Sequence, residues 1–93
     1  MPEVKVRLYG IFRDKVGKNE ILINSKNLLD TIFHVANLIG KEGEKLLLNE
    51  DKSDINPLVK IVINGEKIVT RNTAKISLRQ GDVVAIFPPV GGG

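Results

Sequence analysis

Alternating apolar and polar residues predict the first strand of this chain at residues 4–9. Val4, Val6 and Leu8 recur at the two-residue period of a half-buried strand, so they should face a core. The residues between them, two of which are basic, fall on the opposite face. A second apolar run at residues 21–23 follows a polar turn, and we expect the two strands to pair as a hairpin.

The apolar period lengthens to that of a helix after Asn27. Asn27 is a good N-cap residue, Asp30 suits the positive end of a helix, and Gly40 is a typical stop signal. The apolar positions of this segment lie at helical spacing: Leu28, Ile32, Val35, Ala36 and Ile39. The pattern predicts one main helix of about twelve residues.

The segment after this helix is more polar and less regular. Residues 44–48 are compatible with a short second helix, and residues 49–54 predict a surface loop. A weak calcium-loop spacing begins at Asn49, but Asp54 and Lys60 stand where such a loop needs glycine and glutamate. We therefore expect no metal site.

Further strands are expected in the second half of the chain, at residues 59–63, 67–69 and 83–87. Asn64-Gly65, between the first two, is a strong signal for a two-residue hairpin turn. The resulting order of elements predicts an α+β roll, in which a mixed sheet of four to five strands packs on one main helix.

Length and residue inventory restrict the function. The chain has room for a single domain over residues 1–93, of which residues 88–93 should form an extended C-terminal tail. Cysteine is absent, which excludes disulfides, thiol nucleophiles and thiolate metal sites. The one histidine, His34, falls within the predicted helix and is expected at its surface. We expect no active site of its own in this chain and no bound cofactor.

Charge and hydropathy argue against two kinds of partner. The net charge is +3, the basic residues are scattered, and one tyrosine and three phenylalanines are the only aromatic residues. Binding of nucleic acid is therefore not expected, although Lys5, Arg7 and Lys60 on one face leave an RNA-binding module as the weakest alternative. No apolar run approaches the roughly 18 residues of a membrane-spanning helix. We expect a cytoplasmic protein.

The end of the sequence carries the strongest functional signal. Pro88-Pro89 should hold an extended backbone. The tail continues through Val90, Gly91, Gly92 and Gly93. Six extended residues reach about 20 Å, and glycine can pass through a channel too narrow for a side chain. The tail would deliver the carboxylate of Gly93 to a partner that supplies ATP, magnesium and the attacking nucleophile.

A second candidate surface lies on the side of the predicted sheet away from the helix. That side should be polar when a helix covers only the other one, yet apolar side chains alternate onto it beside the tail. They are Tyr9, Val62, Val83, Ala85 and Phe87. Such a group predicts a docking surface for a protein.

Several stretches of the chain resemble one protein family. They are Val4–Gly10 with Phe12–Asp14 and Val16-Gly17, then Val62–Gly65 and Gly81–Gly93, of which the last is the most specific. On these stretches the chain resembles the MoaD/ThiS family of ubiquitin-like sulfur carriers, and in particular the small subunits of molybdopterin synthase. The resemblance implies a β-grasp fold, in which the first and last strands lie parallel at the centre of the sheet.

The resemblance also implies a reaction and its partners. A ubiquitin-activating-type enzyme would use ATP and magnesium to adenylate Gly93, which then becomes a thiocarboxylate. The sulfur would pass to a pterin precursor in the large subunit of molybdopterin synthase. Tyr9 and Phe87 match aromatic contact positions of the family, and Arg13 matches a basic residue near the tail. Pro88, Pro89 and Val90 would contact the same partners.

The sequence departs from the family pattern at two positions, and alternative functions of the tail stay open. Gly91 replaces a more usual Ser, Thr or Ala, and Lys67 stands at a position that is often apolar. In a ubiquitin-like protein modifier the same carboxylate is joined to lysines of target proteins, and in related carriers it serves tRNA thiolation. A thiamin carrier fits less well, because residues 41–57 form a long middle insertion.

Overall fold

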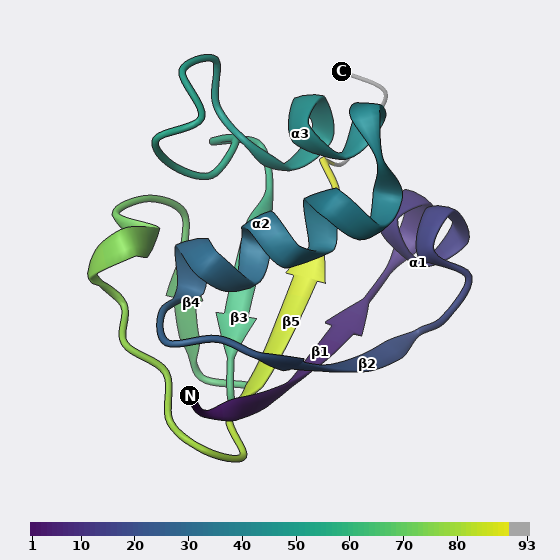
Figure 1. The fold of residues 1–93 in the computed structure, drawn as a ribbon. Helices are drawn as coiled ribbons and strands as arrows, with labels where there is room; N and C mark the ends of the chain where they lie inside the picture. Colours follow the sequence, from purple (N-terminus) through teal and green to yellow (C-terminus); the bar gives the residue numbers. More distant parts are fainter. Residues whose placement is uncertain (90–93) are drawn as a thin grey trace.

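Five strands form one mixed sheet in the computed structural model, which describes residues 1–89 (Figure 1). In chain order the strands are β1 (Glu3–Leu8), β2 (Glu20–Asn24), β3 (Lys60–Ile63), β4 (Lys67–Val69) and β5 (Val83–Phe87). Their order in space is β2-β1-β5-β3-β4. β1 and β5 lie side by side and parallel, and the other neighbours are antiparallel. The predicted α+β roll is therefore confirmed, and each predicted strand agrees with the observed one to within one residue at either end.

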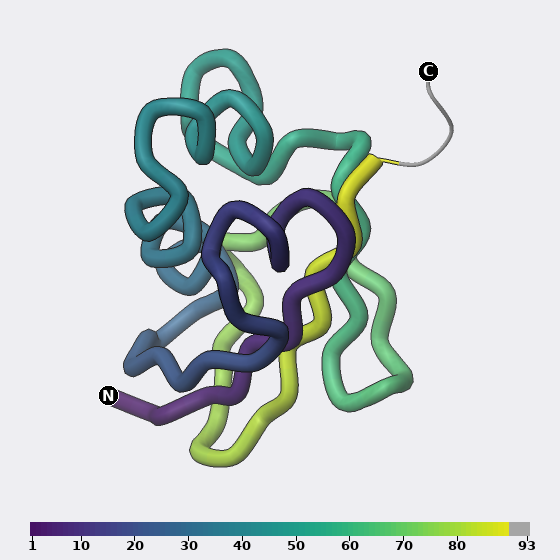
Figure 2. Tube along the Cα trace, turned by 90° about the vertical axis from the view of Figure 1, so that its right-hand side faces the viewer, coloured from purple at the N-terminus to yellow at the C-terminus, as the bar shows by residue number. Residues whose placement is uncertain are grey.

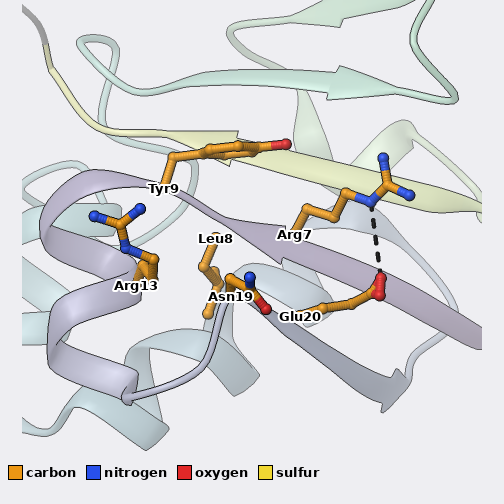
Figure 3. Close-up of a pocket in the computed structure, with 6 residues that line it drawn as sticks. All are labelled: Arg7, Leu8, Tyr9, Arg13, Asn19 and Glu20. Atoms are coloured by element: carbon orange, nitrogen blue, oxygen red, sulfur yellow. Dashed lines mark ion pairs between the residues drawn. The ribbon is translucent and has the colours of Figure 1, made fainter.

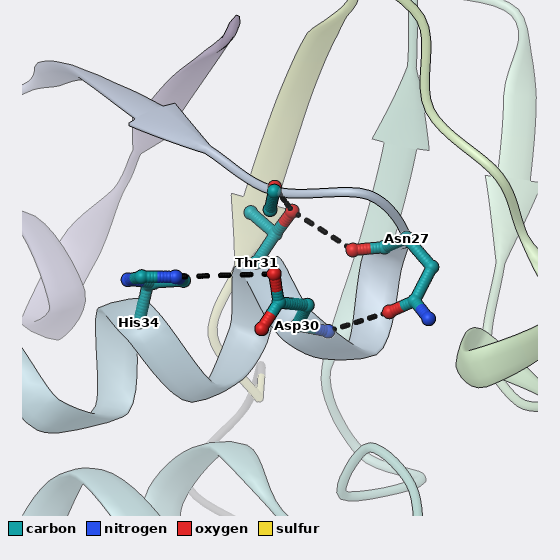
Figure 4. Close-up of polar contacts among 5 residues, drawn as sticks. Asn27, Asp30, Thr31 and His34 are labelled. Carbon is teal, nitrogen blue, oxygen red and sulfur yellow. Dashed lines mark hydrogen bonds and ion pairs between the residues drawn. The ribbon is translucent and has the colours of Figure 1, made fainter. Parts of the chain in front are cut away.

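The main helix, α2 (Leu28–Ile39), covers one face of the sheet and has the predicted bounds (Figure 1). Its N-cap is also the predicted one. The backbone N of Asp30 donates to Oδ1 of Asn27 over 2.8 Å, and Oγ1 of Thr31 donates to the Asn27 carbonyl over 3.2 Å (Figure 4). His34 lies on the exposed side of α2, with Nε2 3.9 Å from the carboxylate of Asp30.

The core lies between the sheet and α2. Alternate residues of β1, β3 and β5 point to this side and meet the apolar face of the helix. Buried members include Val4, Val6, Leu8, Leu28, Ile32, Val35, Ala36, Ile61, Val84 and Ile86. Burying a side chain of this size stabilises the fold by roughly 1.5–3 kcal/mol. The two periodicities of the sequence thus account for the main contacts of the core.

Short helical elements complete the described part of the chain: α1 (Gly10–Val16), α3 (Lys41–Leu47) and η1 (Thr73–Lys75). The predicted short helix is present, but it begins at Lys41 rather than at Glu44. No helix within residues 1–89 is long and apolar enough to cross a membrane.

The connection between β1 and β2 differs from the predicted hairpin. α1 occupies it, and Phe12 of α1 is fully buried in the core. β1 and β2 nevertheless pair as antiparallel strands, from Glu3 opposite Asn24 to Arg7 opposite Glu20. A helix of seven residues makes only two turns, too few for an apolar period to stand out in the sequence. Its position depends on the burial of Phe12.

The turn between β3 and β4 is longer than predicted. Residues 64–66 form a three-residue loop, as the strand register requires. The side chain of Asn64 reaches a second turn: Nδ2 donates to Oδ1 of Asp82 over 3.0 Å, and Oδ1 accepts from the backbone N of Val83 over 2.8 Å. These two bonds fasten the loop to the start of β5.

Candidate functional site

The two central strands fix the start of the tail. Parallel neighbours run in the same direction, so β1 and β5 end at the same edge of the sheet, with Leu8 opposite Ile86. Tyr9 follows the end of β1, and Pro88 follows the end of β5. Figure 2 shows the chain turning into α1 next to the end of β5. The root of the predicted tail and Tyr9 therefore lie together.

Tyr9 and Phe87 form an aromatic pair at this edge. Their rings are stacked, with centroids 4.5 Å apart and an angle of 8° between the planes. Tyr9 is 37% exposed and Phe87 is half-buried. A stacked pair contributes about 0.5–1.5 kcal/mol beyond the burial of its surface. The stack gives the edge a firm apolar surface directly before the two prolines.

Gly10 packs against the first proline. Its φ is +56°, and a Cβ at this position would lie 2.8 Å from Cγ of Pro88. Glycine adopts this backbone angle at little steric cost and leaves room for the ring. Gly10 therefore sets the distance between the start of α1 and the root of the tail. Gly10 falls within a stretch that resembles the family, directly after a predicted strand, but the sequence pattern assigns it no role of its own.

The outward side of the sheet carries a continuous apolar group, named the apolar sheet face here. The register places Val62 of β3 beside both Ala85 of β5 and Ile68 of β4. The members of the face are Tyr9, Val62, Ile68, Val83, Ala85 and Phe87. Ile68 is 60% exposed and is absent from the sequence-based expectation, because a strand as short as β4 does not show which way its residues alternate.

Basic side chains border the apolar sheet face. Lys60 lies opposite Phe87 on one side. On the other side, Nζ of Lys5 and Nε of Arg7 each lie 3.8 Å from the same carboxylate oxygen of Glu20. Exposed pairs of this kind add little stability, but two cations around one carboxylate leave this border positive. The face therefore suits a partner with an apolar centre and acidic surroundings.

Arg13 lies on α1, close to the aromatic stack. Its side chain is about half exposed, and Nε lies 3.5 Å from Oδ1 of Asp14. A cavity of about 310 Å³ opens here, with the side chains of Arg7 and Arg13 on either side of it and the Tyr9 ring beside it (Figure 3). Its lining consists of Arg7, Leu8, Tyr9, Arg13, Asn19 and Glu20. The lining holds two guanidinium groups against one carboxylate, that of Glu20, so the cavity suits an acidic side chain of a partner.

The reactive end of the predicted tail lies outside the described residues. Pro88 and Pro89 are described, and Val90, Gly91, Gly92 and Gly93 are not. Within residues 1–89, no three His, Asp or Glu side chains are grouped so as to hold a metal ion. The structure thus brings together the tail root, the aromatic stack, the apolar sheet face and the Arg13 cavity.

Comparison with known proteins identifies the class to which this arrangement belongs. Small archaeal modifier protein 3 of Haloferax volcanii is 31% identical over 93 residues, covering 98% of this chain and 99% of that protein. The solution structure of small archaeal modifier protein 1 from Methanosarcina acetivorans gives a TM-score of 0.78 at 25% identity, covering 100% of this chain and 98% of that one. A candidate molybdopterin converting factor subunit 1 from Pyrococcus furiosus gives a TM-score of 0.72 at 25% identity, covering 97% and 100%.

The fold is a ubiquitin-like β-grasp fold, and the protein is of the small archaeal modifier and sulfur carrier class. Residues 6–93 match the ThiS family, and the chain belongs to that family. The family and the fold expected from the sequence resemblance are therefore confirmed.

Proposed function

We propose that this chain is a sulfur carrier whose working group is the carboxylate of Gly93. The observation that carries the proposal is the position of the tail root. Residues 88–89 follow β5 directly beside the stacked Tyr9 and Phe87, at the margin of the apolar sheet face. A partner that docks on this face meets the tail where it leaves the domain. Membership of the ThiS family supports the same chemistry.

The bond-making steps belong to a partner, a ubiquitin-activating-type enzyme that uses ATP and magnesium. An oxygen of the Gly93 carboxylate attacks the α-phosphorus of ATP, and pyrophosphate leaves. The acyl-adenylate has a good leaving group, which the free carboxylate lacks. A sulfur nucleophile then attacks the acyl carbon, and AMP leaves with the electron pair of the broken C–O bond. This chain contributes docking and reach, which place the carboxylate at the reacting phosphorus.

The sulfur passes, in this proposal, to a pterin precursor held by the large subunit of molybdopterin synthase. Similarity to the Pyrococcus furiosus protein over 97% of this chain supports that assignment. The large subunit and the activating enzyme would both use the apolar sheet face, with Arg13 contacting acidic side chains beside it. The two partners therefore bind in turn and not together.

Protein modification is the second candidate function. The 31% identity to small archaeal modifier protein 3 over nearly the whole chain favours it. In this reaction a lysine amine attacks the acyl carbon, AMP leaves, and the amine loses a proton to give an isopeptide bond. Both functions use the same carboxylate and the same docking surface, so they differ only in the nucleophile.

Intact-mass measurement tests the proposal. The chain ending at Gly93 is incubated with its cognate activating enzyme, ATP, magnesium and sulfide. We expect a mass gain that matches the exchange of one oxygen for one sulfur. The variant lacking Gly93 is the control and should stay unmodified, because its carboxylate stops about 3.5 Å short of the reacting centre. An unchanged wild-type mass, with an enzyme shown to act on another carrier, contradicts the proposal.

The same preparation separates the two candidate functions. Transfer of labelled sulfur from the chain to a pterin, on addition of the large subunit, supports the molybdopterin pathway. Gly-Gly remnants on lysines, found in digests of cells that express the N-terminally tagged chain, support protein modification. Absence of such remnants, with cofactor synthesis lost on deletion of the chain, contradicts it.

A further inference from the structure

The two edges of the sheet are built differently. β4, at one edge, has three residues and includes Lys67. β2, at the other edge, has five residues, and its centre is Ile21, Leu22 and Ile23. Exposed edges are ordinarily protected by shortness, charged residues or proline within the strand. The one charged residue of β2, Glu20, stands at its start, and β2 has no proline, so the edge along its apolar centre is open to pairing with another strand.

The backbone of β2 has free hydrogen-bonding groups on its outer side. In an antiparallel ladder, only alternate residue pairs exchange hydrogen bonds. At one end of the ladder, the backbone N of Leu8 donates to the Asn19 carbonyl over 2.9 Å. At the other end, the backbone N of Ser25 donates to the Pro2 carbonyl over 3.0 Å. By alternation from these two bonds, the N–H and C=O groups of Glu20, Leu22 and Asn24 point away from β1.

A groove lies beside this edge and has an exposed apolar side chain on each bank. Leu22 of β2 is 61% exposed, and Leu38, near the end of α2, is 58% exposed. The groove encloses about 540 Å³ and is lined by Lys5, Lys18, Glu20, Ile21, Leu22 and Leu38. Figure 1 shows α2 passing above β2 at this margin of the sheet. An added strand would turn alternate side chains toward Leu38 and toward Leu22.

The groove is positively charged. Lys18 forms no ion pair with any other residue in the range 1–89. Glu20 is shared between Lys5 and Arg7 at 3.8 Å from each. Cations therefore outnumber carboxylates around the groove, and charge complementarity selects an acidic partner.

We infer that the β2 edge docks an extended segment of a partner protein, about six residues long, which joins the sheet as a further strand. Backbone hydrogen bonds to Glu20, Leu22 and Asn24 hold the segment. Its apolar side chains cover Leu22 and Leu38, and its acidic ends meet the lysines of the groove. Lys5 and Glu20 line this groove and also stand at the border of the apolar sheet face, so the two surfaces adjoin.

A synthetic peptide tests the inference. The probe is acetyl-Asp-Val-Thr-Val-Ile-Val-Asp-amide, titrated into isotope-labelled protein and followed by NMR. We expect the largest amide shifts at Glu20, Leu22 and Asn24, changes at the methyl groups of Leu38, and an affinity that falls as salt rises. The same peptide with N-methyl groups at alternate positions lacks ladder donors and should not bind. Replacing both Asp residues with Asn should weaken binding.

Two exposed apolar residues on opposite edges provide matched variants. Leu22 and Ile68 are 61% and 60% exposed, and threonine at either position keeps strand propensity while removing apolar surface. Leu22→Thr should lower the affinity for the peptide about fivefold and leave activation of Gly93 unchanged. Ile68→Thr should weaken docking of the activating enzyme and leave peptide affinity unchanged. Failure of this inference is thereby distinguishable from failure of the proposed function.

Several results would overturn the inference. They are no shift at β2 up to millimolar peptide, equal binding of the N-methylated peptide, and shifts confined to the apolar sheet face. Sedimentation of the protein alone gives one more outcome. A dimer whose β2 amides are protected from hydrogen exchange would assign the edge to a second copy of this chain, and the partner segment would then be wrong.

Discussion

At the scale of single residues, Gly10 contacts Pro88 at the root of the proposed tail. Gly10→Ala puts a Cβ 2.8 Å from Cγ of Pro88 and holds alanine at a φ of +56°. We expect the free energy of unfolding to fall by about 1–2 kcal/mol. The rate of adenylation should also fall, because Pro88 is displaced at the root of the tail. Thermal unfolding and single-turnover adenylation measure the two effects.

Gly17→Ala is the matched control for this change. Gly17 lies at the other end of α1 with a φ of +85°, and no atom lies within 4 Å of a Cβ placed there. Gly17→Ala therefore carries the same kind of cost of holding alanine at a positive φ, but it makes no contact with Pro88. Equal adenylation rates for the two folded variants would show that Gly10 does not aim the tail.

At the scale of elements, Asp54 joins the loop before β3 to η1. Its carboxylate accepts hydrogen bonds from Oγ1 and N of Thr73, at 2.6 and 3.1 Å, and from N of Asn72 at 2.7 Å. Burial alone would raise the pKa of Asp54, but these bonds, led by the Thr73 hydroxyl, outweigh burial and hold its pKa below the ordinary value. One ionised group therefore connects two segments that are far apart in the sequence.

Asp54→Ala should lower the free energy of unfolding by about 2 kcal/mol at neutral pH, or the Tm by about 10 °C. Because the folded pKa is lowered, the stabilisation is fully present above the pKa of the unfolded chain, about 3.9. It is lost as the pH falls through the lower folded value. Denaturation of the wild type and of Asp54→Ala should therefore converge in acid.

The control for this change is Asp51→Ala in the same loop. Asp51 is exposed and accepts hydrogen bonds only from the neighbouring Ser53 among the described residues. Its removal should have a much smaller effect on stability. A large loss in Asp51→Ala, or a difference for Asp54→Ala that persists in acid, would contradict the role given to Asp54.

At the scale of the whole molecule, the proposed function assigns docking and chemistry to different parts of the chain. Phe87→Ala removes half of the aromatic stack and the edge of the apolar sheet face beside the tail. An aromatic anchor is commonly worth about 2 kcal/mol, so affinity for the activating enzyme should fall roughly thirtyfold. Deletion of Gly93 should leave that affinity nearly unchanged. Titration calorimetry measures the affinity of both variants for the enzyme, and circular dichroism checks that they are folded.

Leu58→Ala serves as the control for docking. Leu58 is 71% exposed and lies outside the apolar sheet face, in the loop before β3. The affinity of the Leu58→Ala variant for the activating enzyme should equal that of the wild type. Wild-type affinity in a folded Phe87→Ala variant would mean that the enzyme docks on another surface.

The sequence by itself determined those features that depend on residues close together along the chain. The strand alternation of residues 4–9 and 83–87, the helix that begins after Asn27 and the stop at Gly40 all follow local periods or caps. The same local information separated the two faces of the sheet, because alternate residues of a strand must point in opposite directions. The tail motif that ends at Gly93 was also evident from adjacent residues alone.

Only the tertiary structure decided the features that join distant segments. Gly10 meets Pro88, Asp54 bonds to Thr73, and Asn64 bonds to Asp82. Ile68 completes a face begun by β3 and β5. α1 belongs with them, since the burial of Phe12 and not its own short period holds it in place. These contacts depend on distance in space, and a pattern along the chain carries no information about which distant residue fills a given position.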